Sequence, residues 1–176
     1  MTTFTSVTDK FAHQIGMGVM TYGQLENDLR TLFCLMANID FQTGMRIWSA
    51  MEFRPQRDVL QSLSVLKLDG NPMQGEFGRV IGEVKKANNT RNKLSHWSWA
   101  KDANTEEMIW ISIDNRTGFK VRFEEKTYNS LVEDINQIGR ARTAVRALTE
   151  KIKPEVDAWH EKHRESYPEA PGHEAG

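Results

Sequence analysis

The residues whose types and spacing best fit chemistry in this chain are Arg91, Asn92 and His96, in the run Arg-Asn-Lys-Leu-Ser-His. The arginine supplies a fixed cation, the asparagine supplies hydrogen bonds, and the histidine supplies a base that titrates near neutrality. These groups are much of what is needed to cleave an RNA phosphodiester without a metal ion. We therefore take the three residues as the candidate catalytic set.

The spacing of these residues limits how they can meet. Positions five apart on an ideal helix are displaced by about 140° around its axis, so we expect Arg91 and His96 not to face one point from an intact helix. Asn92 and His96 are four apart and can touch. The chemistry then needs a helix that loosens near His96, or two copies that meet across a dimer axis. His96 would move the proton, Arg91 would stabilise phosphoryl charge, and Asn92 would hold the phosphate or fix the histidine tautomer.

Each of the two main candidates also has a purely structural interpretation. His96 falls at a helix end, where a histidine can cap the last backbone carbonyls. Arg91 lies on the inward stripe of its helix, where a buried cation must be paired, and Glu26 or Asp58 are candidate partners. Both structural roles are compatible with the same fold.

Four segments with apolar residues three or four positions apart predict the helices that position these residues, at 8–37, 43–68, 72–95 and 127–153. Pro55 predicts a kink or break near Phe53. Asn71 is expected to cap the third helix with Pro72 at its first position. Pro154 is expected to end or bend the fourth, and Val156 and Trp159 could continue it. Gly16, Gly18 and Gly23 lower the helix propensity of the first segment and are expected to allow close helix packing.

The period of the apolar pattern changes from 3.6 to 2 between the third and fourth helices. Alternating runs at 108–113 and 119–123 flank a turn at 114–118 that contains Gly118, which predicts a β-hairpin. The expected fold is therefore all-α, a four-helix-bundle-like domain with a β-hairpin inserted between the third and fourth helices. We expect one domain over residues 1–165 and a disordered tail over 166–176.

Charge, cysteine content and apolar runs limit how this chain can bind RNA and where it is expected to act. The chain has 23 basic and 24 acidic residues, a net charge of −1, so any RNA contact must come from a local patch. Two sets of basic residues are candidate patches: Lys85, Lys86, Arg91 and Lys93, and then Arg140, Arg142, Arg146, Lys151 and Lys153. The second set can instead form a solvated helix face. The single cysteine, Cys34, is expected to be a packed thiol in a reducing compartment. No signal peptide and no apolar run of roughly 18 residues is present, so we expect a cytoplasmic protein with no membrane contact.

Other motifs give weaker signals. His160 and His163 are three apart, which does not match a zinc-protease motif, and we expect no metal and no cofactor. Arg54 and Arg57 could line a phosphate pocket or form ion pairs. Trp97, directly after His96, could stack on a base or close the core.

With four helices and Arg91-Asn92…His96 closing the third, the chain resembles the HEPN superfamily over roughly residues 8–153. The resemblance implies that Arg91 and His96 are a catalytic pair with Asn92 as the auxiliary polar residue. It also implies a homodimer that composes the active site from two motifs, and metal-independent endoribonuclease activity in a toxin–antitoxin, phage-defence or RNA-processing setting. RNA is then the expected substrate, and a cognate antitoxin protein is a further candidate partner.

Two other functions stay open. The chain could be a non-catalytic HEPN-like module that binds RNA, a nucleotide or a partner protein. It could also be a helical interaction protein in which Arg91 and His96 only stabilise the bundle.

Overall fold

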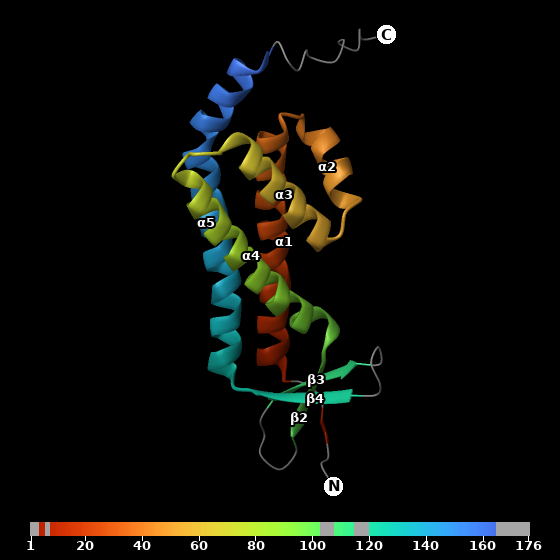
Figure 1. The fold of residues 1–176 in the computed structure, drawn as a ribbon. Coiled ribbons are helices and arrows are strands. Elements are labelled where there is room, and N and C mark those ends of the chain that lie inside the picture. The colour runs from red at the N-terminus through yellow and green to blue at the C-terminus, as the bar shows by residue number, and fades with distance from the viewer. Residues whose placement is uncertain (1–3, 6–7, 103–107, 115–119, 165–176) are drawn as a thin grey trace. The chain divides into compact units, whose positions relative to one another are not determined.

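A computed structural model describes residues 4–5, 8–102, 108–114 and 120–164. These residues form mainly helices and one small antiparallel sheet, most of which comes from the segment of the chain between the last two helices (Figure 1). The helices are α1 (Asp9–Ala37), α2 (Phe41–Ser49), α3 (Phe53–Lys67), α4 (Met73–His96) and α5 (Tyr128–Lys162). The strands are β1 (Phe4–Thr5), β2 (Ser98–Asp102), β3 (Met108–Asp114) and β4 (Lys120–Lys126). The prediction of a mainly helical chain with strands before its last helix is confirmed.

The predicted second helix is two helices in the structure. Residues 50–52 separate α2 from α3, and Pro55 is the third residue of α3. A proline in the first turn breaks no backbone hydrogen bond, because the first N–H groups of a helix have no partner within it. The buried Gln56 amide donates to the carbonyls of Trp48 and Met51, both at 3.0 Å, and so satisfies the end of α2. The expected break near Phe53 is confirmed.

Prolines and caps also set the bounds of the later helices. The Asn71 side chain accepts a hydrogen bond from the Met73 backbone N–H at 2.8 Å, so α4 begins as predicted, within one residue. At Pro154, α5 does not end but continues to Lys162. Ile152 and Val156 are both fully buried, and their burial on either side of the proline offsets the lost hydrogen bond.

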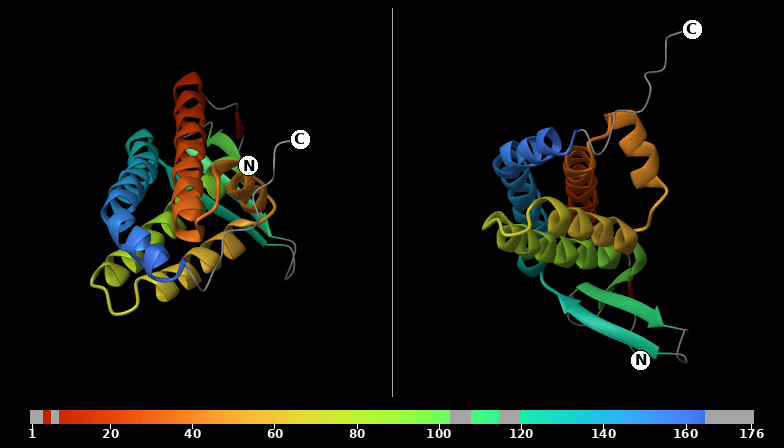
Figure 2. Two further views of the ribbon diagram at one scale, coloured as in Figure 1. Left: turned by 90° about the horizontal axis from the view of Figure 1, so that it is seen from above. Right: turned by 45° about the horizontal axis from the view of Figure 1, so that its top comes forward.

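The strands form one antiparallel sheet in the order β1-β2-β3-β4. The paired strands β3 and β4, which lie side by side in Figure 2, are the predicted hairpin strands. Trp99 in β2 lies opposite Trp110 in β3, and Trp110 lies opposite Glu124 in β4. The pairing of β1 and β2 was not predicted from the sequence. The predicted tail and all of the predicted turn except Asp114 lie outside the described residues.

The chain divides into two compact units. Unit 1 comprises residues 1–28 and 82–144, and unit 2 comprises residues 29–81 and 145–176, so α1, α4 and α5 each contribute to both. In unit 1, a Cβ atom at Gly18 would lie 2.6 Å from a Leu94 methyl and 3.0 Å from Ile135. The expected close packing is therefore found at Gly18, whereas Gly16 and Gly23 have open space around them.

Candidate functional site

The candidate residues lie in unit 1, where α4 meets β2. The Trp97 N–H still donates to the Lys93 carbonyl at 3.2 Å, so the helical hydrogen bonds run to the end of the motif. His96 is the last residue of α4, and β2 begins at Ser98. Arg91 and Asn92 are half-buried and His96 is exposed. The motif therefore combines a partly desolvated cation with a histidine that solvent can reach.

Arg91 brings the three residues together within one chain. Its Nη1 donates to Asn92 Oδ1 at 3.2 Å and lies 3.5 Å from His96 Nε2. A guanidinium only donates hydrogen bonds, so Arg91 is the donor in any hydrogen bond between these two groups. The expectation that Arg91 and His96 cannot face one point is wrong. The arginine side chain is long enough to reach around the helix to its final residue, without loosening of α4 and without a second copy.

Tyr22 and Asn88 extend this cluster. The buried Tyr22 hydroxyl donates to Asn88 Oδ1 at 2.8 Å, and the Arg91 guanidinium carbon lies 5.6 Å from the Tyr22 ring centroid. Burial and the nearby Glu26 raise the pKa of Tyr22 above its ordinary value, and Arg91 offsets only part of that rise. Tyr22 is not among the candidate site residues that the sequence alone indicates. The available signal was Asn88, four residues before Asn92 on the same helix face.

Neither structural interpretation of Arg91 and His96 matches these contacts. Within the described part of the chain, no carboxylate lies within 4.0 Å of the Arg91 guanidinium. Asp58, one expected partner, pairs instead with Arg54 at 3.9 Å and Arg57 at 2.6 Å. The His96 ring contacts Arg91 and not a carbonyl at the end of α4.

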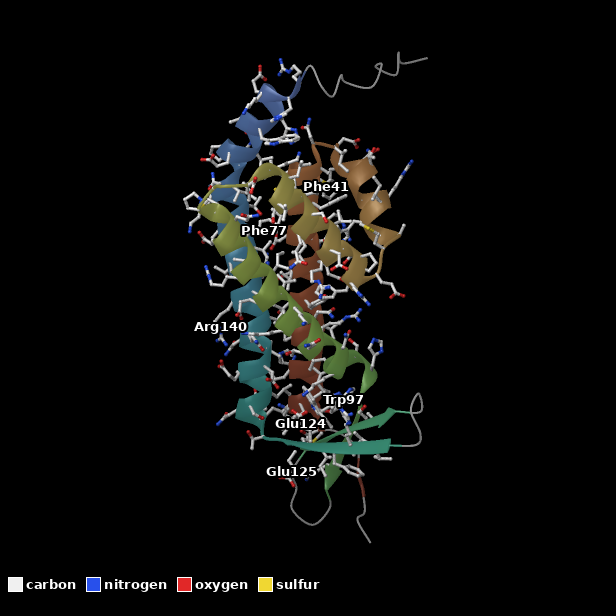
Figure 3. All side chains as sticks on the ribbon, viewed as in Figure 1. Phe41, Phe77, Trp97, Glu124, Glu125 and Arg140 are labelled. Carbon is white, nitrogen blue, oxygen red and sulfur yellow. The ribbon has the colours of Figure 1, made fainter. Side chains whose placement is uncertain are left out.

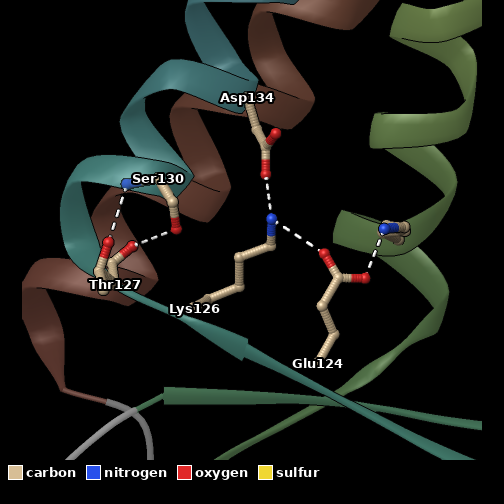
Figure 4. A network of polar contacts seen from close by, with 6 residues as sticks. Glu124, Lys126, Thr127, Ser130 and Asp134 are labelled. Carbon is tan, nitrogen blue, oxygen red and sulfur yellow. Dashed lines mark hydrogen bonds and ion pairs between the residues drawn. The ribbon is translucent and has the colours of Figure 1, made fainter.

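A chain of ion pairs holds the end of α4 against the sheet and α5 (Figure 4). Lys93 pairs with Glu124, whose other oxygen lies 2.9 Å from Lys126 Nζ, and Lys126 also lies 2.8 Å from Asp134. Burial acts to raise the pKa of Glu124, but hydrogen bonds from both lysines hold it below its usual value. Burial likewise acts to lower the pKa of Lys126, and its two carboxylate partners raise it above the usual value. The charged forms of Glu124 and Lys126 are thus both favoured where α4, β4 and α5 meet.

Three tryptophans, Trp97, Trp99 and Trp110, form an apolar cluster next to these ion pairs. Trp110 is fully buried, with the Trp99 ring centroid at 4.6 Å and the Trp97 centroid at 5.9 Å, both edge-on. Figure 3 shows Trp97 and Glu124 together on the side of the sheet toward the helices, and Glu125 on the other side. Trp97 itself is half-buried, and its edge-on contact with the buried Trp110 is compatible with the packing role expected for it.

No protein-family model, curated protein or solved structure matches this chain. The functional argument therefore rests on the geometry of the site.

Most of the basic residues proposed as an RNA-binding patch are ion-paired. Arg142 pairs with Asp28 at 2.9 Å and Arg140 with Glu133 at 2.6 Å, while Lys86, Lys93, Lys151 and Lys153 also have carboxylate partners. Among the described residues, Arg91 thus differs from these in being half-buried with only an amide and an imidazole as polar partners. Its positive charge is available to an incoming anion.

The remaining motifs do not assemble into a second catalytic cluster. The described residues contain no group of three or more His, Cys, Asp or Glu side chains able to hold a metal ion. His163 stacks on Trp159 with ring centroids 4.2 Å apart, and burial raises the pKa of the Cys34 thiol, which makes that thiol a weaker nucleophile. In the same described part of the chain, no helix has the length and apolar character needed to cross a membrane.

Proposed function

We propose that this protein is a metal-independent endoribonuclease of the HEPN type, with Arg91, Asn92 and His96 as its active residues. One observation carries the proposal: a half-buried arginine, with no carboxylate partner among the residues that the structure describes, lies 3.5 Å from the nitrogen of an exposed histidine. An arginine in a structural ion pair would have its charge already compensated. Arg91 instead offers its donors to an anion beside a base, which is the arrangement that phosphodiester transesterification needs.

The contact between Arg91 and His96 suggests how the reaction would begin. A bound phosphate is a stronger acceptor than imidazole, so its oxygens would draw the Arg91 guanidinium away from His96 Nε2. The freed Nε2 would take the proton of the ribose 2′-hydroxyl, and the 2′-oxygen would form its bond to phosphorus as the bond to the 5′-oxygen breaks. Arg91 would stabilise the charge on the non-bridging oxygens, and Asn92 would orient the phosphate. The products are a 2′,3′-cyclic phosphate and a 5′-hydroxyl end.

The leaving 5′-oxygen also needs a proton, and this step supports a homodimer. One histidine that has just accepted a proton on Nε2 can pass it to the leaving group only if it can reach both oxygens. A second His96, from a partner copy across a twofold axis, would supply a separate acid. A toxin–antitoxin, phage-defence or RNA-processing setting would suit this activity, and in the first of these an antitoxin protein would be the further partner.

The test is cleavage of end-labelled RNA in excess EDTA by wild type, Arg91→Ala and His96→Ala. Two matched controls remove the same residue types elsewhere in unit 1: Arg140→Ala, at an exposed ion pair, and His13→Ala, at an exposed position of α1. We expect cleavage with cyclic-phosphate ends by wild type and both controls, and its loss in the two site variants. Equal cleavage by all five proteins, or none by wild type, would overturn the proposal.

A second candidate function is RNA binding without cleavage. The observation that favours it is the Arg91–His96 contact itself, because it occupies the nitrogen that would act as base. Wild type that binds RNA without cutting it, with binding weakened by Arg91→Ala but not by Arg140→Ala, would identify this function.

A further inference from the structure

Unit 2 contains a cavity of about 1190 Å³ that is unrelated to the Arg91 cluster. It is lined by the end of α1, the start of α2, the end of α3 and the last turns of α5. Much of its wall is apolar, and two of the wall residues, Phe41 and Leu66, are more than half exposed. Apolar side chains around an open cavity are typical of sites for small organic ligands.

Lys67, the last residue of α3, extends into this cavity as a buried cation. Its side chain is buried, with the residue only 8% exposed. Its Nζ lies 2.7 Å from His160 Nε2 and 4.5 Å from the centroid of the Trp159 ring. Among the described residues, no carboxylate lies within ion-pair distance of this nitrogen. A buried ammonium is normally paired with an acid, so this one lacks the partner that its charge requires.

The carboxylates around the cavity are already engaged elsewhere. Asp157 pairs with Lys153 at 2.9 Å, and Glu161 pairs with Arg164 at 2.7 Å. Asp40 caps α2, where it accepts the Thr43 N–H at 3.0 Å. Among the described residues that line the cavity, Lys67 is therefore a buried cation without a carboxylate partner.

The surroundings of Lys67 keep this charge ready for an anion. Burial lowers the pKa of Lys67 to about 8, so the ammonium form still predominates at neutral pH. Burial and the adjacent Lys67 both lower the pKa of His160, which favours a neutral ring that accepts from the ammonium. An anion placed here would gain a charge-assisted hydrogen bond in partly desolvated surroundings.

We propose that this cavity binds a small organic carboxylate with an apolar body, its head group on Lys67 and its body against Leu63, Leu66 and Phe41. This buried cation matches a monoanion, and the apolar wall matches a hydrocarbon or aromatic body. The proposal is independent of the RNA-cleaving function, because the residues of the two sites belong to different units.

The test is calorimetric titration of the full chain with sodium octanoate and with octanamide, which has the same body but no charge. Octanoate should bind wild type about tenfold more tightly or better, which is the size expected for a hydrogen bond to a charged group. Lys67→Met should remove that preference and leave octanamide binding unchanged. Lys151→Met, at an exposed lysine of unit 2 paired with Glu76, is the matched control and should behave as wild type.

A second variant keeps the test decisive if Lys67→Met does not fold. Leu66→Glu places a carboxylate at an exposed wall position beside Lys67 and should abolish the octanoate preference by competing for the ammonium. The proposal is overturned if octanoate does not bind at millimolar concentration, if octanoate and octanamide bind wild type equally, or if the preference survives in both cavity variants.

Discussion

At the scale of single residues, the length of the Arg91 side chain decides which residues the candidate site brings together. Arg91 contacts Asn92 beside it and His96 five positions along the chain, and its guanidinium carbon lies 5.6 Å from the Tyr22 ring centroid. A planar guanidinium with several donors can make these contacts together, whereas a lysine ammonium is a compact point charge on a flexible stem. The function of the site should therefore depend on the shape of the cation as well as on its charge.

Arg91→Lys tests this dependence. We expect RNA cleavage to fall by about tenfold or more, since a lysine keeps the charge but cannot bind two phosphoryl oxygens through a donor fork. The measurement is kcat/KM on a short RNA, with Arg140→Lys as the matched control at an exposed ion pair. An Arg91→Lys enzyme as active as wild type would mean that only the charge matters.

Tyr22 makes a second prediction at this scale. Its raised pKa means that the phenol stays protonated in the folded protein well above pH 10.0, the ordinary value. A spectrophotometric titration should therefore show one of the three tyrosines ionising later than the others, or only on unfolding, and Tyr22→Phe should remove that late step. Because the unfolded chain releases this proton first, the tyrosine's contribution to stability is present below pH 10.0 and is lost as pH rises further.

The Tyr22 hydroxyl should also contribute to stability at neutral pH. Tyr22→Phe leaves the Asn88 carbonyl oxygen without its donor, and we expect a loss of about 1–2 kcal/mol in the free energy of unfolding. Urea denaturation at pH 7 measures this difference. An unchanged midpoint would show that water replaces the hydroxyl without cost.

At the scale of secondary-structure elements, the sheet positions the end of α4. One carboxylate oxygen of Glu124 in β4 forms an ion pair with Lys93 of α4, and the other forms an ion pair with Lys126. Lys126 also forms an ion pair with Asp134 of α5. Trp97, Trp99 and Trp110 pack edge-on below these charges. The hairpin therefore fixes where the helix stops, and so where His96 lies.

Glu124→Ala and Glu125→Ala separate this role from general surface charge. The two glutamates are neighbours on β4, but Glu125 is exposed on the opposite side of the sheet (Figure 3). We expect Glu124→Ala to lower the free energy of unfolding by about 1 kcal/mol, because the network is only partly exposed, and Glu125→Ala to change it little. Urea denaturation of both variants is the measurement, and equal effects would contradict the proposed role of the network.

The same pair of variants has a pH dependence. The pKa of Glu124 is lowered in the folded protein, so its stabilising contribution is present above the ordinary value of 4.5 and is lost as pH falls through the folded value. Wild type and Glu125→Ala should therefore lose stability in that acid range more steeply than Glu124→Ala.

At the scale of the whole molecule, the chain carries two separate groups of candidate functional residues, one in each compact unit. The Arg91 cluster belongs to unit 1, and the cavity around Lys67 belongs to unit 2. Long helices contribute to both units. Variants of one site should therefore leave the chemistry of the other unchanged.

The proposed homodimer is a prediction at this scale. Light scattering at micromolar concentration should give twice the chain mass of 20.2 kDa. If the acid for the leaving group comes from a partner copy, the specific activity should also fall on dilution below the dissociation constant. A monomer with undiminished activity on dilution would show that one His96 performs both proton transfers.

Local signals in the sequence determined much of the architecture. The 3.6-residue period located the long helices, the period of 2 located β3 and β4, and the chemistry of Pro55 and Asn71 placed a break and a cap. These features depend on residues close together in the chain, so they can be predicted from the amino-acid sequence. Arg91, Asn92 and His96 could be proposed as a candidate set from the sequence, because their residue types and their spacing along the chain do not depend on tertiary structure.

Tertiary structure alone decided which charges are compensated. The ion pairs of Arg142 with Asp28 and of Lys93 with Glu124 join residues far apart in the chain, as does the contact of Lys67 with His160. The sequence left open whether the last helix stops at Pro154 or continues, and the burial of Ile152 and Val156 in unit 2 accompanies its continuation. Whether a cation is free to bind an anion depends on every group that surrounds it in space, and that environment exists only once distant segments have packed together.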